Sequence, residues 1–237
     1  MRLATLAIGL SAIALTASAT AAPNIVQNGS FEALTKGYGQ LGSNTDATGW
    51  NANGGYDFVY STANIDTGVN GQYGNNTLWT ANNGGLSLIP VSPFGGNFLA
   101  LDGAFSVAAL TQTLSTIAGH TYSVSFAYAG AQQKGFDSAT TEAFTVSLGN
   151  QSFKTPVLSN ANHGFTGWQL QSFTFTAQTA NDILSFLSNG TPNGVPPFSL
   201  LDGVSVVDTT KTPVPEAATL GLLGLGLGVV AVARRRK

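Results

Sequence analysis

Hydrophobic and polar residues alternate along several short stretches of this chain. In TYSVSFAYA, large apolar side chains occupy every second position, at Tyr122, Val124, Phe126 and Tyr128, and the residues between them are small. The stretch EAFTVSLG has the same period, with apolar residues two positions apart around Val146. A period of two is typical of a β-strand that buries one face. Both stretches are therefore predicted to be strands.

Six more stretches bounded by glycine and asparagine are predicted to be strands. Strands with no helical period between them favour an antiparallel sandwich or barrel, because parallel strands need long crossovers. The glycine-rich links 37–55 and 65–85 are expected at the ends of the sandwich, and Trp50 and Trp168, each after a glycine, in its core. The six stretches are YDFVYS, GNFLALDG, SVAALTQTL, WQLQSFTFTA, NDILSFLS and SLLDGVSVV.

The N-terminus departs from this pattern. Arg2 precedes an apolar run, residues 3–15, and small residues with Ala-x-Ala cleavage options at 17–19 and 19–21. A basic start, a short apolar core and such a site are typical of a secretory signal peptide. Residues 1–22 are therefore predicted to be a signal peptide.

The C-terminus departs from the pattern as well. Residues 217–233 carry no charge, and Thr219 is their one polar side chain. A helix of this length would span about 26 Å at about 1.5 Å per residue, near the lower limit for a hydrocarbon core of about 30 Å. Positive charge favours the cytoplasmic side, so a transmembrane helix 217–233 would place the body outside. The charges that follow it are Arg234, Arg235, Arg236 and Lys237.

The ending VPEAATLGLLGLGLGVVAVARRRK resembles the PEP-CTERM sorting tail of Gram-negative bacteria. Val214, Pro215 and Glu216 match its motif, whereas Ala217 stands where a second proline is common. The resemblance implies a sorting tail over residues 211–237 that engages the membrane. It also implies an exosortase-type processing protease that cuts near the motif and passes the body to the envelope or matrix.

The charge of the body excludes one class of partner. Residues 23–210 contain three lysines, no arginine and ten acidic residues, a net charge of −7. Such a body cannot supply the counterion release that drives nucleic-acid binding. The chain has no cysteine, which excludes thiol catalysis, disulfides and cysteine zinc sites.

The body carries a second resemblance, in segments that follow one another in order. It resembles the galactose-binding-like jelly roll of carbohydrate-binding modules and of secreted PEP-CTERM proteins. This implies one antiparallel jelly-roll β-sandwich over residues 23–210, while function stays open because such folds host several functions. The segments are NIVQNGSFEA, TGW, GNFLALDG, AGHTYSVSFAYA, GWQLQSFTFTA and LLDGVSVVD.

The jelly-roll resemblance also implies a structural calcium ion. The matching carboxylates are Glu32 and Asp202, with an oxygen near Asn28, and Asp102 is a weaker candidate. Calcium takes about six to eight hard oxygen ligands, so two carboxylates would supply part of its shell. The alternative is that Glu32 and Asp202 face solvent or cap turns.

Sugar sites pair an aromatic face with amides or carboxylates. Trp79 lies in the asparagine-rich stretch QYGNNTLWTANNGG, with Tyr73, Asn76 and Asn82 nearby. These four residues are the predicted sugar-binding site. The alternative is that Trp79 anchors the loop on the edge of the sandwich.

Catalytic signatures are absent from the sequence. His120 and His163 are isolated in predicted loops, no acidic pair has a spacing that fixes two carboxylates across a glycosidic bond, and G-x-S-x-G and H-E-x-x-H do not occur. We therefore predict a non-catalytic protein of the cell envelope, cell surface or matrix of a Gram-negative bacterium, which binds extracellular polysaccharide through its loops. The alternatives are a structural or adhesive surface protein without a sugar site, and a carboxylate-dependent glycan hydrolase.

Overall fold

The computed structural model describes residues 22–210. The predicted signal peptide, apart from Ala22, and the predicted tail with its helix 217–233 lie outside these residues. Within residues 22–210, no helix has the length and apolar character needed to cross a membrane.

Residues 22–210 form thirteen strands and one short 3-10 helix, η1 (Ala81–Asn83). All eight predicted strand stretches contain a strand. The strands are β1 (Gly39–Gln40), β2 (Asp57–Ser61), β3 (Val69–Gly71), β4 (Gly74–Asn76), β5 (Asn97–Asp102), β6 (Leu110–Ser115), β7 (Thr121–Gln132), β8 (Thr140–Leu148), β9 (Gln151–Lys154), β10 (Leu158–Asn160), β11 (Gln169–Thr176), β12 (Asn181–Thr191) and β13 (Pro197–Asp208).

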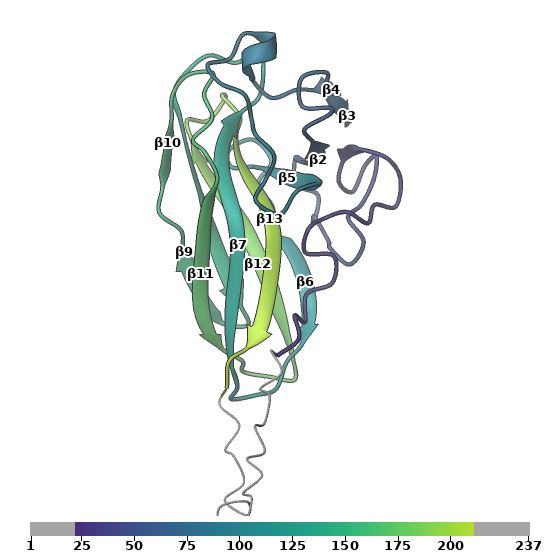
Figure 1. The fold of residues 1–237 in the computed structure, drawn as a ribbon, viewed down its shortest axis with the longest axis vertical. Helices are drawn as coiled ribbons and strands as arrows, with labels where there is room; N and C mark the ends of the chain where they lie inside the picture. Colours follow the sequence, from purple (N-terminus) through teal and green to yellow (C-terminus); the bar gives the residue numbers. More distant parts are fainter. Residues whose placement is uncertain (1–21, 211–237) are drawn as a thin grey trace, which may run out of the picture.

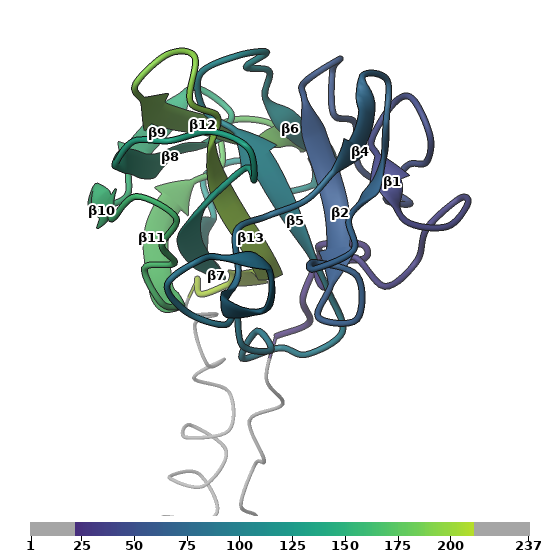
Figure 2. The ribbon, with the colours of Figure 1, turned by 90° about the horizontal axis from the view of Figure 1, so that it is seen from above.

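The strands form a two-sheet sandwich (Figures 1 and 2). The larger sheet has the order β11-β7-β13-β5-β2-β1-β3-β4, and the smaller has the order β10-β8-β12-β6, with β9 also paired to β8. All pairings between these strands are antiparallel except that of β1 with β3. The predicted all-β sandwich is confirmed.

The main core lies between the two sheets and follows the period of two seen in the sequence. Along β7, Tyr122, Val124, Phe126 and Tyr128 are all in this core, and β8 contributes the alternating residues around Val146. The core includes edge-to-face aromatic contacts, such as Phe126 with Phe186 of β12 at 5.0 Å between ring centroids. The link 37–55 lies at the side of the sandwich and not at an end, so its predicted position is wrong, whereas Trp50 lies in this core, as predicted.

A second apolar cluster covers the outer face of the larger sheet. Phe58 of β2, Phe98 of β5 and Phe198 of β13 point to this face, and Ile65 and Leu78 of the link 65–85 pack on them. The link also reaches the end of the sandwich opposite the chain termini, where Figure 1 shows η1, as predicted, and its residues Ile65 and Leu78 cover the outer face in addition. The larger sheet has apolar side chains on both faces, so the link must lie across the outer one to bury them.

The two ends of the sandwich differ. At one end, called here the tail pole, Asn24 pairs with Val207 and Thr209 donates its N–H to Thr121, so both ends of the described chain lie there. At the opposite end, called the loop pole, β2 and β13 begin and β5 and β7 end. The turns after β5, β7 and β12 therefore meet at the loop pole.

Candidate functional site

An aromatic pocket of about 400 Å³ lies at the loop pole. Its walls come from segments far apart in the chain: the β3–β4 hairpin, the start of β2, and the turns after β5, β7 and β12. The residues that line it include Tyr56, Tyr73, Phe105, Phe136 and Pro196. None of the lining residues carries a charge.

Three rings define the shape of this aromatic pocket. Tyr73 and Phe105 are 69% and 60% exposed, and their planes meet at 77° with centroids 6.0 Å apart. Tyr56 is buried and contacts both, at 5.9 Å from Tyr73 and 5.5 Å from Phe105. Two exposed rings set nearly at right angles over a third leave apolar faces open to a ligand.

Amide groups supply the polar atoms of the aromatic pocket. Asn75 donates from Nδ2 to the Thr67 carbonyl at 2.7 Å, which fixes its side chain. Gln133 also lines the pocket, and its Oε1 is buried without a hydrogen-bond partner among the described residues. A buried acceptor without a donor is costly, and a donor that reached Gln133 Oε1 would offset this cost.

Two buried carboxyl groups, Asp102 and Asp57, form hydrogen bonds with the backbone next to the pocket. Asp102 ends β5 and accepts N–H groups from Ala104, Phe105 and Ser106 at 2.9, 3.1 and 3.2 Å, which holds the Phe105 turn in place. Asp57 accepts the Asp102 N–H at 3.2 Å through Oδ1, and its Oδ2 has no partner among the described residues. Burial raises the pKa of both carboxyl groups. Asp102, the weaker calcium candidate, is thus engaged in a turn.

Of the four predicted sugar-binding residues, Tyr73 lines the aromatic pocket and the other three do not. Trp79 donates from Nε1 to the Phe136 carbonyl at 3.1 Å, and His163 stacks on its ring at 3.9 Å. Asn76 is buried, where it joins Tyr60 and Tyr56 through hydrogen bonds of 2.6 and 3.2 Å. Asn82 is exposed and donates to Asp66 at 2.7 Å.

No sequence pattern indicated four of the lining residues, Tyr56, Phe105, Phe136 and Gln133. They lie in four different segments, and no local pattern joins them. The one available signal was a large aromatic beside glycine or serine in a predicted turn, as in GAFS around Phe105. That signal is common in β-proteins and does not by itself indicate a ligand.

The two predicted calcium carboxylates lie close together. Gly96 has φ +56°, and a Cβ there would lie 1.6 Å from Glu32 Oε1, so glycine allows Glu32 to accept the Asn97 N–H at 2.7 Å. Asp202 is fully buried, and its Oδ2 has no partner among the described residues. Burial, with a smaller contribution from the charge of Glu32, raises the pKa of Asp202 to about 7.

Asn28 has a different role in the structure. Its Nδ2 donates to the carbonyls of Ala33 and Thr48 at 2.9 and 3.0 Å, and its Oδ1 accepts the Ala33 N–H at 3.0 Å. The side chain therefore clamps two loop segments together. Within residues 22–210, no three His, Cys, Asp or Glu side chains gather as a metal site, so a cation beside Glu32 and Asp202 would need backbone or solvent oxygens.

The two histidines pair with carboxylates on the surface. His120 Nδ1 lies 2.6 Å from Asp208 Oδ2 near the tail pole, and His163 Nε2 lies 2.6 Å from Asp137 Oδ1. Neither pair borders the aromatic pocket. Each links two neighbouring segments of the surface.

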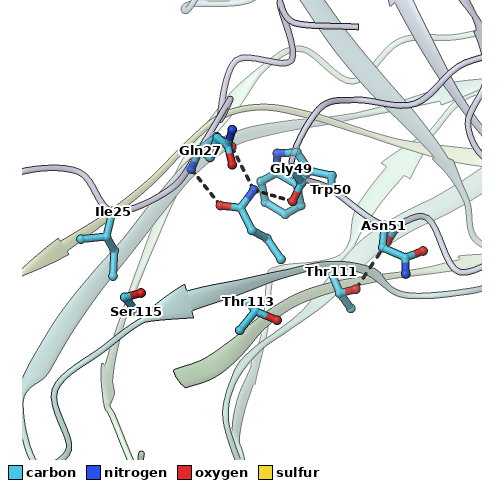
Figure 3. Close-up of a pocket in the computed structure, with 9 residues that line it drawn as sticks. Ile25, Gln27, Gly49, Trp50, Asn51, Thr111, Thr113 and Ser115 are labelled. Carbon is cyan, nitrogen blue, oxygen red and sulfur yellow. Dashed lines mark hydrogen bonds between the residues drawn. The ribbon is translucent and has the colours of Figure 1, made fainter. Parts of the chain in front are cut away.

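A second cavity, of about 540 Å³, runs along the outer edge of β6 (Figure 3). We call it the β6 groove. One wall is β6 with Thr111, Thr113 and Ser115, and the other is formed by residues 25–27 and 49–51. Between the walls, the Gln112 side chain donates to the carbonyls of Gln27 and Gly49 at 2.9 and 3.0 Å.

Comparison with solved structures finds carbohydrate-binding modules. TmCBM61, solved with β-1,4-galactotriose, is 14% identical with a TM-score of 0.41, over 79% of this chain and 99% of that one. The CBM22-1 xylan-binding domain of Paenibacillus barcinonensis Xyn10C is 15% identical with a TM-score of 0.38, over 82% and 100%. A family 16 module is 14% identical with a TM-score of 0.38, over 78% and 99%. What each binds is a property of that protein. No curated protein matches the chain.

Comparison with family models gives two matches that together cover most of the chain. Residues 213–237 match the PEP-CTERM protein-sorting motif, which confirms the resemblance of the tail and indicates an exported protein sorted to the cell surface. Residues 24–206 match the model described as a protein of unknown function, DUF642. The second match spans nearly the whole sandwich, and the chain therefore belongs to the DUF642 family.

Proposed function

We propose that this protein binds a neutral polysaccharide outside the cell through the aromatic pocket at the loop pole. The observation that carries the proposal is the pair of exposed rings, Tyr73 and Phe105, set nearly at right angles over Tyr56. Soluble proteins bury large aromatics where they can, so clustered exposed rings favour a binding role.

The chemistry of the aromatic pocket fits a sugar. Aromatic faces pack against the apolar faces of pyranose rings, and the amides of Asn75 and Gln133 can bind hydroxyls. The pocket volume of about 400 Å³ lies in the range of small-ligand sites. An acidic glycan would meet no cation in the lining and an acidic body around it, so a neutral glycan is favoured.

The sorting motif bears on where the binding site would be located in the cell. We propose that an exosortase-type protease processes the tail near Val214, Pro215 and Glu216, and that the membrane holds the chain before processing. The loop pole is opposite the end from which the tail leaves, so the aromatic pocket would face away from the membrane.

Affinity electrophoresis tests the binding proposal. The full chain in detergent is run through gels that contain xylan or β-1,4-galactan, or polygalacturonate as an acidic glycan. We expect at least one neutral glycan to retard the protein, and Tyr73→Ala and Phe105→Ala to abolish most of the retardation, because stacking contributes about 1 kcal/mol or more per ring.

Leu170→Ala is the matched control, since Leu170 of β11 is 70% exposed but lies outside the pocket. Unchanged mobility in every neutral glycan tested would count against the proposal and favour a structural or adhesive surface protein. Turnover of a glycan, lost on replacing one carboxylate, would instead favour a hydrolase.

We further propose a structural calcium ion beside Glu32 and Asp202. The buried, unpartnered Oδ2 of Asp202 and the nearby Glu32 carboxylate provide negative charge with too few donors, and a cation would balance it. The ion would tie the N-terminal segment to β13. Asn28 is left out of the proposed ligands, because its side-chain oxygen is already bonded.

Calorimetry with calcium or chelator tests this ion. Calcium at about 100 times its dissociation constant should stabilise the fold by about 2.7 kcal/mol, and Glu32→Gln or Asp202→Asn should remove the difference. Asp137→Asn, at a side chain 78% exposed, should keep it. An equal melting temperature with calcium and with chelator in the unsubstituted protein would refute the site.

A further inference from the structure

The outer edge of β6 has unused hydrogen-bonding groups. Thr111 exchanges both backbone hydrogen bonds with Asn51, each of 2.9 Å, on the side away from β12. Because the direction of these groups alternates along a strand, the N–H and C=O of Thr113 and Ser115 point to the same side. Among the described residues, these N–H and C=O groups of Thr113 and Ser115 have no hydrogen-bond partner. The pairing that Asn51 starts therefore stops after one residue.

Natural sheets usually protect such an edge, and this one is open. β6 has the sequence LTQTLS, with no charge, no proline and no bulge to deter pairing. No charged side chain lines the β6 groove. The edge is thus suited to accept another strand.

The shape and chemistry of the β6 groove select an extended peptide. The wall formed by residues 25–27 and 49–51 faces this edge across a cavity of about 540 Å³ (Figure 3), and a groove bounded on both sides suits a single extended segment better than the edge of a second sheet. Backbone groups two residues apart repeat at about 6.6–6.8 Å, which matches the repeat of a β-strand. A glycan is less suited, because Trp50, the one aromatic in the lining, is only 7% exposed.

The chain itself contains a segment with the pattern that such an edge accepts. Residues 212–216 read Thr-Pro-Val-Pro-Glu. Proline is tolerated in an edge strand where its nitrogen faces away from the neighbour. If Thr212, Val214 and Glu216 face β6, then Pro213 and Pro215 both have their nitrogens on the outer side, where no N–H is needed. The segment lies outside the described residues.

The position and direction of the β6 groove also suit this segment. The Ile25 N–H donates to the Val206 carbonyl at 2.9 Å, so the groove wall is bonded to the end of β13, close to where the tail leaves. Six extended residues after Thr210 reach about 20 Å. β6 runs toward the tail pole, so a segment that turns back along it would be antiparallel, as Asn51 is.

We propose that the β6 groove binds the chain's own sorting segment, residues 211–216, as an added antiparallel strand. Val214 and its neighbours then donate N–H groups to the open edge at Thr113 and Ser115. The groove and the processing protease compete for the same residues. Release of the segment from the groove becomes a step that precedes processing.

Hydrogen exchange in the full chain, in detergent, tests this inference. The amides of Thr113 and Ser115 should be protected in the unsubstituted chain. Val214→Pro removes an N–H that the added strand needs, and should raise their exchange rate about tenfold, the effect of one lost hydrogen bond of ordinary strength. Pro215→Ala is the matched control, because it restores an N–H on the outer side and should leave exchange unchanged.

Both substitutions lie outside the sandwich, so neither threatens its folding. Equal exchange at Thr113 and Ser115 in the Val214→Pro and unsubstituted chains would overturn the inference. So would an equal rise in both variants, since it would show no preference for the facing residue. Protection that disappears on dilution would assign the strand to a neighbouring copy and overturn the intramolecular form.

Discussion

Burial, more than pairing with a charged group, sets the pKa of several carboxyl groups in this protein. Glu142 of β8 is fully buried; it accepts a hydrogen bond from Thr140 at 2.5 Å, and its Oε2 has no partner among the described residues. Burial raises its pKa from 4.5 to about 8. The folded protein therefore keeps a neutral carboxyl group at Glu142 near neutral pH.

This raised pKa predicts how stability depends on pH. The folded state holds the Glu142 proton more tightly than the unfolded state, so its contribution is complete below pH 4.5 and is lost as the pH rises through about 8. Between pH 4.5 and about 8, the unfolding free energy of the unsubstituted protein should fall as the pH rises. Glu142→Gln should make this slope less steep by up to about 1.4 kcal/mol per pH unit. Urea titrations across this window measure it.

Other buried carboxyl groups, including Asp202, also make the unfolding free energy depend on pH, but they do so equally in the unsubstituted chain and in Glu142→Gln. The difference between the two curves therefore gives the contribution of Glu142 alone. Asp46→Asn, at an exposed position outside the two histidine–carboxylate pairs, serves as the control and should leave the curve as it is. Parallel curves for Glu142→Gln and the unsubstituted chain would contradict the neutral carboxyl.

At the scale of elements, the link 65–85 forms a second layer of the molecule. Leu78 is fully buried between this link and the outer face of the larger sheet, beside Phe58 and Phe98. The same link carries β3, β4 and Tyr73, so the layer also positions part of the aromatic pocket. The apolar contacts of this link therefore contribute both to the stability of the fold and to the position of Tyr73 in the aromatic pocket.

Leu78→Ala should therefore destabilise the fold by about 2–5 kcal/mol, the usual cost of emptying a fully buried leucine site. Chemical denaturation followed by tryptophan fluorescence measures the loss. Leu86→Ala, at a 67% exposed position near the same link, should change stability by less than about 0.5 kcal/mol. A similar effect of the two substitutions would show that the link does not form a packed layer.

At the scale of the whole molecule, the sandwich separates its two poles. The aromatic pocket lies at the loop pole, and both ends of the described chain lie at the tail pole. Strands β7 and β13 run the length of the molecule between them. A protein held by its tail would present the pocket outward.

The separation of the two poles predicts where an inserted protein tag would leave glycan binding intact. A protein tag inserted after Thr210 should leave glycan retention unchanged, because it adds bulk at the tail pole. The same tag inserted at Gly194, which lines the pocket, should abolish retention while the sandwich stays folded, since loop tips accept insertions. Affinity electrophoresis and circular dichroism together test both, and loss of retention with the tag after Thr210 would contradict the arrangement.

Local sequence patterns predict the sandwich, the sorting tail and eight of the thirteen strands of residues 22–210, and they miss the short strands β1, β3, β4, β9 and β10. Period-two alternation, as at Tyr122 to Tyr128, is local and follows from burial of one strand face. The membership of the aromatic pocket was decided by tertiary structure alone. Tyr56, Phe105 and Gln133 meet because β2 pairs with β5, and β5 and β7 both pair with β13, which brings their ends together at the loop pole. Such pairing between distant segments leaves no local pattern. Likewise Asn76, polar and near Tyr73 in sequence, is buried because it forms hydrogen bonds with Tyr60 and Tyr56, which are distant in sequence.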